Sequence, residues 1–529
     1  MWGSRGNTPG TTRRGIRGRK RIRRLAAAAL ALLAATGCGG GGTSAASDDG
    51  AGTRPLRVVT SYAVESLSPL EQGLWAPEWG YGELLMRATE DGRVEPWVLA
   101  GLDRADATAW DLRLRDGVRF QNGRALDAAA LTGMLTAHLH GNSRAASALP
   151  DATARAVDDT TVRLTTARPT PNMPNLLADE TVFPVFDAQA AAEAAGDDAA
   201  LAEAGVWTGP FTVTSLTADA LTLARDPDWW GGDVRLPGVE VRFVPDGQAR
   251  VLAVRGGEAD LAFYPPTEAL RGLTGAEAVE AAGGATPLRG FLNTAAAPLD
   301  EPEVRRALSL AIDYDALAAE VLDGFYRAPL GMYPETVPYA EPTVRTDPDE
   351  AAALLDAAGW TRTGDGPRTR DGETLALTVV SYSTQPDTRV VATALQAQLR
   401  ESGFAVEVRD VPANYAAMQE TLDWHVGLSF DSSLGTTFDP RARLRDFLHS
   451  DGQYNFGAVA DARLDALIED LDTEFDTARQ DGILREVQGI VAQEAYALFL
   501  TERPARVVAG PGWEDYRVSS VLQHVGPRT

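Results

Sequence analysis

Residues 110–123 read W-D-L-R-L-R-D-G-V-R-F-Q-N-G, and this stretch decides how the rest of the chain is interpreted. Apolar Trp110, Leu112 and Leu114 alternate with charged residues, which is the period-two pattern of a strand buried on one face. The Asp-Gly pair that follows marks a turn. We therefore expect these three apolar side chains to belong to a core, and not to a binding surface.

Outward from this stretch, short apolar runs alternate with segments of helical periodicity. Strands are expected at 56–60, 221–225, 239–244, 375–382 and 406–411, and helices at 303–322, 349–358 and 391–401. This alternation predicts α/β lobes with mixed sheets. Because 529 residues are too many for one simple core, we expect two lobes.

Composition excludes several classes of protein. Hydrophobic residues make up 44% of the chain, which is not a disordered composition. The net charge of −25 hides an uneven distribution, because positions 1–37 hold nine basic residues and no acidic ones. The remainder has 49 − 9 = 40 basic against 74 acidic residues, a net charge of −34. So acidic a domain repels nucleic acid and anionic lipid surfaces.

The N-terminus has the pattern of an export signal. A basic segment at 13–24 is followed by an apolar segment at 25–35, which is shorter than the roughly 20 residues that span a bilayer. The sequence A-T-G-C then ends at Cys38, the single cysteine of the chain, and resembles a bacterial lipobox. This resemblance implies a signal peptide at 1–37, lipid on Cys38, and a Gly/Ser-rich tether at 38–54. The alternative is an ordinary cleaved signal peptide with a stray cysteine.

Several further motifs occur in a fixed order along the chain. They are E-P-W-V-L-A at 95–100, T-G-P-F at 208–211, R-D-P-D-W-W at 225–230, G-G-E-A-D-L at 256–261, V-R-R-A-L-S-L-A-I-D at 304–313, D-P-D-E-A-A-A-L-L-D-A-A-G-W at 347–360, and F-D-P at 438–440. Together with 110–123, these motifs resemble the family 5 extracellular solute-binding proteins, the peptide and nickel binders of ABC transporters. The resemblance runs from about residue 56 to 518.

The resemblance implies a fold and a set of partners. The fold would be a two-lobed clamp of the periplasmic-binding-protein kind, with solute in the cleft between lobes that close by hinge motion. Lobe I would hold 55–292 and 499–529, with an extra subdomain at about 80–205, and lobe II would hold 293–498. We expect a lipid-anchored monomer on the outer face of the membrane that serves ABC transporter permease subunits and needs no cofactor.

A set of aromatic and polar residues is expected to line or border the cleft. Aromatic walls with one or two polar anchors suit an organic solute, and an arginine fork suits a carboxylate. The expected residues are Tyr62, Trp75, Arg144, Trp424, Phe430, Phe438 and Asn455. The alternative for each aromatic residue is core packing, and for Arg144 it is a solvated surface charge.

The identity of the solute depends on the segment around Asp439–Pro440. Peptide-binding relatives place an Asp four residues before this proline for the free amine of the peptide, but this chain has Thr436 there. This disfavours an ordinary peptide bound through its free amine, unless Asp431 or Asp439 takes the role. Segments 334–339 and 370–375 resemble the nickel-type branch, and His449 lies near the position of its histidine. We favour a peptide, modified peptide or other amphipathic organic solute, with a nickel or metal chelate as the alternative.

Other functional classes have less support. Nucleophilic catalysis requires a nucleophile beside a base, but the chain has no G-x-S-x-G motif and its cysteine is assigned to lipid. The five histidines form no H-E-x-x-H pattern, so neither an enzyme nor a resident metal is expected. His138 and His140 are two apart on an expected helix and are predicted to be surface residues. A binding lobe that feeds a sensor is a third possibility.

Overall fold

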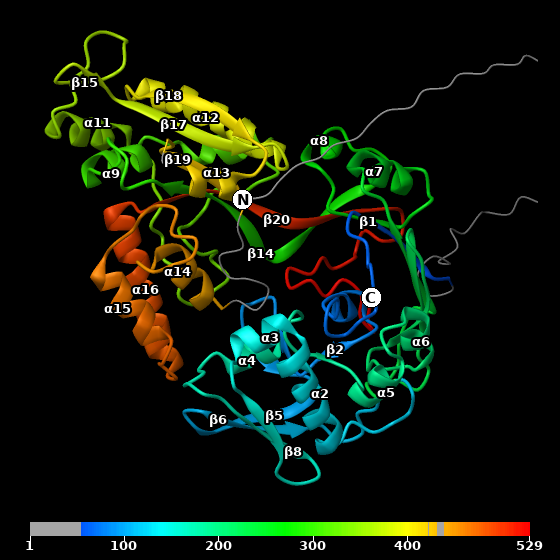
Figure 1. Ribbon diagram of the computed structural model, residues 1–529. Coiled ribbons are helices and arrows are strands. Elements are labelled where there is room, and N and C mark those ends of the chain that lie inside the picture. Colours follow the sequence, from blue (N-terminus) through cyan, green and yellow to red (C-terminus); the bar gives the residue numbers. More distant parts are fainter. Residues whose placement is uncertain (1–53, 422, 431–438) are drawn as a thin grey trace, which may run out of the picture. The chain divides into compact units, whose positions relative to one another are not determined.

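The computed structural model describes residues 54–421, 423–430 and 439–529, and this part of the chain contains a ten-stranded sheet (Figure 1). Its strands follow the order β10-β11-β12-β1-β13-β20-β14-β19-β17-β18. In that order their bounds are Phe211–Leu216, Ala220–Arg225, Gly238–Phe243, Leu56–Thr60, Leu261–Phe263, Ala497–Ala509, Glu277–Leu292, Val426–Phe430, Ala376–Tyr382 and Ala405–Val411. The sheet mixes parallel and antiparallel pairs, which confirms the predicted mixed α/β architecture.

One end of this sheet is built around β1, which pairs in parallel with β12 on one side and with β13 on the other. Helix α7 (Gly247–Arg255) contacts β1, β13 and the returning strand β20. The buried apolar side chains of this region come from positions 56–281 and 507–525 and form two clusters, which we call the lobe I core. The chain therefore returns to its first body after building the second.

A smaller layer is attached to the lobe I core. Its four-stranded sheet has the order β5-β6-β8-β7, with bounds Leu99–Asp106, Ala109–Leu114, Thr161–Thr165 and Thr153–Ala156. Two short pairs accompany it, β2 (Glu83–Leu84) with β9 (Pro184–Val185) and β3 (Met86–Ala88) with β4 (Val94–Pro96). The helices here are α1 to α6, at Trp75–Trp79, Ala128–Gly141, Ser143–Ala148, Met173–Leu177, Ala188–Glu193 and Asp198–Glu203.

The stretch at 110–123 behaves as its pattern predicts. Trp110, Leu112 and Leu114 lie on β6 and are buried in the lobe I core. The prediction for one histidine of α2 is wrong, because His138 is fully buried and its Nε2 lies 2.8 Å from the Pro184 carbonyl oxygen. Burial lowers the pKa of His138 to about 4, so it packs as a neutral ring, whereas His140 is exposed as predicted.

The second body holds the other end of the large sheet. Its buried side chains come mainly from positions 288–500 and form two further clusters, which we call the lobe II core. The helices of this body are α9 to α16 with the π-helical turn η1, and a small hairpin joins β15 to β16. From α9 their bounds are Pro302–Leu310, Tyr314–Ala316, Leu317–Val321 (η1), Pro348–Ala357, Pro386–Glu401, Asn414–Glu420, Arg441–Leu448, Ala462–Leu471 and Thr477–Glu494, with β15 at Thr369–Arg370 and β16 at Glu373–Thr374. Helix α8 (Thr267–Leu270) packs with the lobe I core. The residues at which the lobes divide stay a prediction.

The helix predicted at 303–322 is interrupted in the structure. Helix α9 ends at Leu310, and Asp313 then accepts a hydrogen bond from the Ala316 backbone N–H at 2.9 Å. This is the N-cap geometry that starts a new helix, so α10 and η1 follow as separate turns. The apolar periodicity continues across the break, which is why periodicity alone did not reveal it.

Two long antiparallel strands connect the bodies. Strands β14 and β20 pair from Glu277 opposite Ala509 to Phe291 opposite Ala497. The register shifts between Glu280 and Ala285, so β14 contains extra residues opposite β20 at this point. A Cβ on Gly283, inside this bulge, would lie 2.6 Å from the Glu90 carbonyl oxygen, so only glycine fits that approach.

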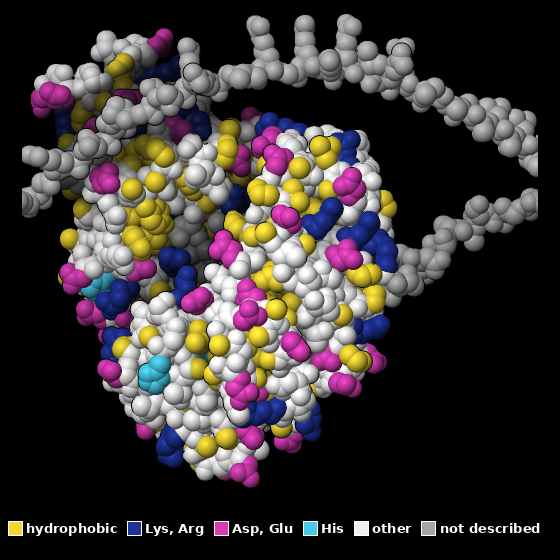
Figure 2. All heavy atoms as spheres, turned by 45° about the vertical axis from the view of Figure 1, so that its right-hand side comes forward, with side chains coloured by type: hydrophobic (Ala, Val, Ile, Leu, Met, Phe, Trp, Pro, Cys, Tyr) yellow, Lys and Arg dark blue, Asp and Glu magenta, His cyan; other side chains and the backbone are white. Residues whose placement is uncertain are grey.

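Acidic side chains form no single dominant patch on the face that Figure 2 shows. On the face drawn in Figure 2, acidic side chains lie scattered among basic ones. Within the described ranges, none of the helices combines the length and the apolar character needed to cross a membrane.

A buried carboxylate fastens the start of β1 to the start of β13. Asp260 accepts hydrogen bonds from the Arg54 guanidinium, at 2.7 Å to each of its oxygens, and from the Arg57 backbone and side chain. Burial alone would raise the pKa of Asp260, but these hydrogen bonds outweigh it and lower the pKa to about 2. The ionised form is therefore the one that stabilises the fold.

We expect Asp260→Asn to lower the free energy of unfolding at pH 7 by about 2 kcal/mol, since the pKa falls from 3.8 to about 2 on folding. The contribution should be fully present above about pH 4, where the unfolded carboxyl is ionised, and should be lost as the pH falls toward 2. Urea unfolding at pH 7 and at pH 3 measures both effects.

The matched control is Asp103→Asn, which breaks the solvent-exposed pair between Asp103 and Arg113. Exposed pairs contribute roughly 0–1 kcal/mol, so this variant should unfold close to the parent. Equal destabilisation by the two substitutions, or an Asp260→Asn effect as large at pH 3 as at pH 7, would contradict the account of this carboxylate.

Candidate functional site

The carboxyl ends of three adjacent parallel strands meet at one edge of the lobe I sheet. Strand β1 lies between β12 and β13, and the connection from β12 through α7 leads to β13 on the other side of β1. In α/β sheets, ligands bind in the crevice outside such carboxyl ends, where the strand order reverses. The residues that follow β1 and β13 at this edge include Tyr62 and Tyr264.

Three aromatic rings gather at this edge. The Tyr62 ring lies edge-on to the Tyr264 ring, with 5.0 Å between centroids, and 6.4 Å from the Trp75 ring. Tyr62 is 54% exposed, and Trp75 is half-buried with its Nε1 donating to Gln72. An exposed phenol ring held by two others offers a ready surface for an apolar or stacking group. The structure thus brings together two of the predicted residues, Tyr62 and Trp75.

Tyr264 has an unfavourable backbone conformation. Its φ is +53°, in the left-handed region that costs a non-glycine residue about 1–3 kcal/mol. The buried Arg250 holds this turn by donating to the carbonyl oxygens of Phe263 and Tyr264, at 3.0 and 2.6 Å. The phenol group lies 3.2 Å from His524 Nε2, and burial, followed by the charge of Glu78, raises its pKa. The hydrogen bonds from Arg250 therefore hold this strained turn in place, and with it the ring that supports Tyr62.

The carboxyl ends of the lobe II strands form a matching edge. Strand β17 runs parallel to β18 and β19, and Phe430 is the last residue of β19. The guanidinium of Arg503, on β20, lies 4.1 Å from the centroid of the half-buried Phe430 ring. The Tyr326 ring lies 6.1 Å from the Phe430 ring between centroids. Phe430, predicted for the site, thus stands at a strand end beside a cation.

A polar contact joins the two edges. The Thr267 hydroxyl, which follows β13, donates to Asp387 Oδ2 at 2.9 Å, and Asp387 lies in the first turn of α12, which follows β17. Tyr326 donates to the same carboxylate. Burial raises the pKa of Tyr326, while the nearby charge of Arg503 acts in the opposite direction. The edges of lobe I and lobe II therefore meet around one small group of side chains.

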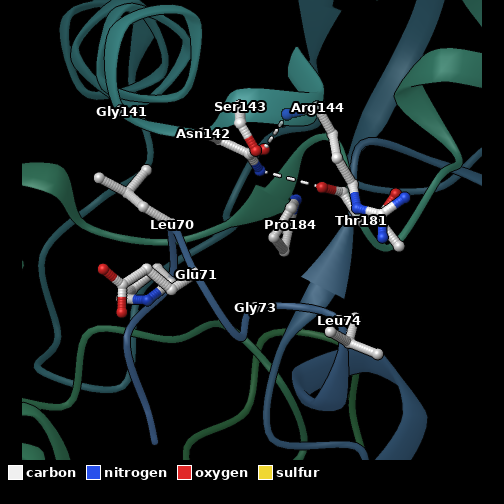
Figure 3. A pocket seen from close by; sticks show the side chains of 11 residues that line it. Leu70, Glu71, Gly73, Leu74, Gly141, Asn142, Ser143, Arg144, Thr181 and Pro184 are labelled. Atoms are coloured by element: carbon white, nitrogen blue, oxygen red, sulfur yellow. Dashed lines mark hydrogen bonds between the residues drawn. The ribbon is translucent and has the colours of Figure 1, made fainter. Parts of the chain in front are cut away.

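Arg144 lies at a separate pocket of about 270 Å³ in lobe I. Its walls are Pro69, Leu70, Glu71, Gly73, Leu74, Gly141, Asn142, Ser143, Arg144, Thr181 and Pro184. Figure 3 shows the side chains of Glu71 and Arg144 on opposite sides of Pro184. Asn142 fixes the loop by accepting from the Arg144 backbone N–H at 2.9 Å and donating to the Thr181 carbonyl at 2.9 Å. Arg144 itself is exposed, and no carboxylate of the described residues pairs with it.

The carboxylate of the Asp439–Pro440 motif is already hydrogen-bonded by other side chains of the protein. Asp439 accepts from Asn172 Nδ2 at 2.8 Å and from Arg441 Nη1 at 2.9 Å, and its side chain is 11% exposed. The contact with Asn172 crosses from lobe II to lobe I. Phe475 of lobe II makes a second such contact, 6.2 Å from the Trp110 ring and under the Arg104 guanidinium. Asp439 is therefore neutralised by protein groups.

The remaining predicted residues are placed differently. Trp424 is 1% exposed in the lobe II core and donates to the Met418 carbonyl, so it has almost no surface to offer. Asn455 uses its side chain within its own loop, donating to the His449 and Val459 carbonyls and accepting from the Val459 N–H. Phe438 lies outside the described residues.

His449, which lies near the position of the histidine of the nickel-type branch, also contacts other groups of lobe II. His449 is 5% exposed, its Nδ1 accepts from the Asp451 N–H at 3.1 Å, and its Nε2 lies 3.5 Å from Glu469. Over the described ranges, no three His, Cys, Asp or Glu side chains are grouped as ligands for a metal ion.

Sequence reasoning missed two residues of the site, Tyr264 and Arg503. Each had a local signal that could have been followed. Tyr264 directly follows the strand of the G-G-E-A-D-L motif and precedes two prolines, as a strand-end residue does. Arg503 follows the apolar segment A-L-F-L-T at 497–501 and precedes the apolar residues Val507 and Val508, and an arginine in so apolar a strand needs a specific partner.

Comparison with known proteins identifies relatives along most of the chain. Residues 93–455 match the family model of the bacterial extracellular solute-binding proteins, family 5. The nickel-binding periplasmic protein of Escherichia coli is 25% identical over 483 residues, which covers 86% of this chain and 91% of that protein. The oligopeptide-binding protein OppA of Bacillus subtilis is 24% identical over 459 residues, covering 78% and 80%.

The fold has solved counterparts. The crystal structure of a nickel ABC transporter protein from Bacillus halodurans superposes with a TM-score of 0.76 at 24% identity, covering 90% of this chain and 99% of that one. At this identity the likeness establishes the shared two-lobed fold, and the chemistry must come from the site.

Proposed function

The chain belongs to the bacterial extracellular solute-binding proteins, family 5, and we propose that it captures a peptide or similar small organic solute and delivers it to the permease of an ABC importer. One observation carries this proposal. The sheet edge formed by the carboxyl ends of the lobe I strands meets the corresponding edge of the lobe II strands, beside the connecting strands β14 and β20. A solute held there would touch both lobes, so its binding would favour their closed arrangement.

The side chains at the edges support an organic solute. Tyr62, Trp75 and Phe430 provide aromatic surface, which gains free energy from apolar burial and stacking. Arg144 provides a charged fork at the lobe I pocket, suited to a carboxylate. These features fit a peptide, a modified peptide or another amphipathic molecule with an acidic group.

A metal chelate is the second candidate, because the relative from Escherichia coli is named a nickel-binding protein. In this case the solute would be an organic chelator that carries the metal, and the same aromatic and arginine groups would bind the chelator. Titration with nickel chloride alone and with nickel plus histidine distinguishes the cases: tight binding of nickel without a chelator would contradict the preference for an organic solute.

Two other classes remain less favoured. We infer that the chain has no catalytic activity, in line with a family of transport proteins and with the lack of nucleophile motifs in the sequence. A sensory role would use the same cleft with a different membrane partner. Co-purification with permease subunits after mild crosslinking would favour transport.

The first test identifies the solute. We expect the protein purified under native conditions to retain a small organic molecule, visible by native mass spectrometry and released on unfolding. Calorimetry with that molecule should show about a tenfold loss of affinity for Arg144→Ala, or about 1.4 kcal/mol. Arg155→Ala, an exposed arginine on β7, is the control and should bind normally. Unchanged affinity in a folded Arg144→Ala variant would place the pocket elsewhere.

The second test concerns the anchor, which lies outside the described residues. We propose that the signal peptide is removed before Cys38 and that this cysteine is lipidated, since it ends an export signal at lipobox spacing. Cys38→Ser should appear in the soluble fraction or accumulate as precursor. Mass spectrometry of the mature N-terminus provides the direct check, and a mature Cys38 without lipid would refute the anchor.

A further inference from the structure

Arg503 lies at the meeting point of the two lobes, and no acidic side chain of the described residues forms an ion pair with it. It is half-buried on β20, and among the described residues its guanidinium donates a hydrogen bond from Nη1 to the neutral Gln385 side chain at 3.0 Å. Within the described residues no carboxylate oxygen lies within 4.0 Å of its guanidinium. A guanidinium carries five N–H donors, so most of its hydrogen-bonding capacity is free.

The described surroundings of Arg503 keep the guanidinium in place and do not compensate its charge. Its face is stacked on Phe430 at 4.1 Å. The carboxylate of the adjoining group, Asp387, already accepts from Thr267 and Tyr326. Glu502, the next residue along β20, is half-buried, and burial raises its pKa to about 7. A positioned, partly desolvated arginine gains most from a planar anion that accepts two hydrogen bonds.

The acidic residue of the family motif shows the opposite arrangement. Asp439 is bound by Asn172 and Arg441, so its charge is compensated by protein groups. A solute amine would have to displace one of these partners, at the cost of leaving it unpaired. The protein therefore compensates the acid of this motif and leaves a cation open at the lobe junction.

From this contrast we propose that Arg503 is a specificity-determining residue that binds an anionic group of the solute, a carboxylate or a group of similar geometry, and that a free amine is not required. This inference rests on the proposed function and narrows it to acidic solutes. Lys in place of Arg503 would keep the charge but lose the planar fork, so it should recover only part of the affinity.

The test uses a defined probe. A pool of free-acid tripeptides, the same pool with amidated C-termini, and the same pool with acetylated N-termini are each mixed with the purified protein, and bound species are counted by native mass spectrometry. We expect free acids to bind with or without N-acetylation, and amides to bind at least tenfold more weakly. Arg503→Gln should lose about tenfold in affinity for free acids and no longer distinguish them from amides.

Controls separate the possible failures. Arg155→Gln should retain the parent preference, and Arg503→Lys reports on the charge if Arg503→Gln does not fold. If the parent binds free acids, and both Arg503→Gln and Arg503→Lys bind them as tightly as the parent does, the role of Arg503 is refuted while the proposed function stands. Preference for amides or dependence on a free amine also refutes it. If the parent retains no solute and binds no pool, the proposed function itself fails, and this inference with it.

Discussion

The antiparallel pairing of β14 with β20 is the constraint on which the rest of this structure depends. These strands belong to one sheet, yet their two ends lie against different cores, so the chain can cross between the bodies only through their ladder. Hydrogen-bonded strands resist sliding past each other, because a one-residue slip would turn every side chain to the other face. The two carboxyl edges are therefore held facing one small region while each body keeps its own core.

The same ladder contains the place where it can bend. Residues 281–284 interrupt its register, and Gly283 approaches the Glu90 carbonyl so closely that a side chain would not fit. Bulges increase local twist and weaken pairing, which makes this segment the natural point for a hinge. The chemistry of the site follows from what the ladder brings together: the aromatic edge supported by the strained Tyr264, and Arg503, which β20 itself carries to the junction.

Much of the fold could be predicted from the sequence, because local patterns decide it. Strands β1, β6 and β17 follow apolar runs or alternation, and their large apolar side chains are buried in the structure. Strand β18, at the edge of the sheet, follows its predicted bounds with its valines half-buried. The family motifs, in their order along the chain, predicted the two-lobed architecture. The interruption at Asp313 was missed because a single capping side chain overrides a periodicity that continues on both sides.

The site was predicted less well, because it depends on which distant segments meet. Tyr62 was chosen because it follows the first strand and Trp75 because it lies in the stretch 71–80, and the structure brings these two rings together. Trp424 was chosen because it flanks the Asp439–Pro440 motif, but it is buried in a core. Arg503 could not be assigned without knowing that β20 passes beside Phe430, 73 positions earlier in the chain.

The central claim is that two bodies joined by one ladder close around a solute. Small-angle X-ray scattering of the purified protein, first freed of solute and then saturated with the molecule it retains, tests this claim most directly. The account predicts a smaller radius of gyration at saturation, because the solute contacts both lobes only when they are closed. An unchanged radius at full occupancy would contradict it.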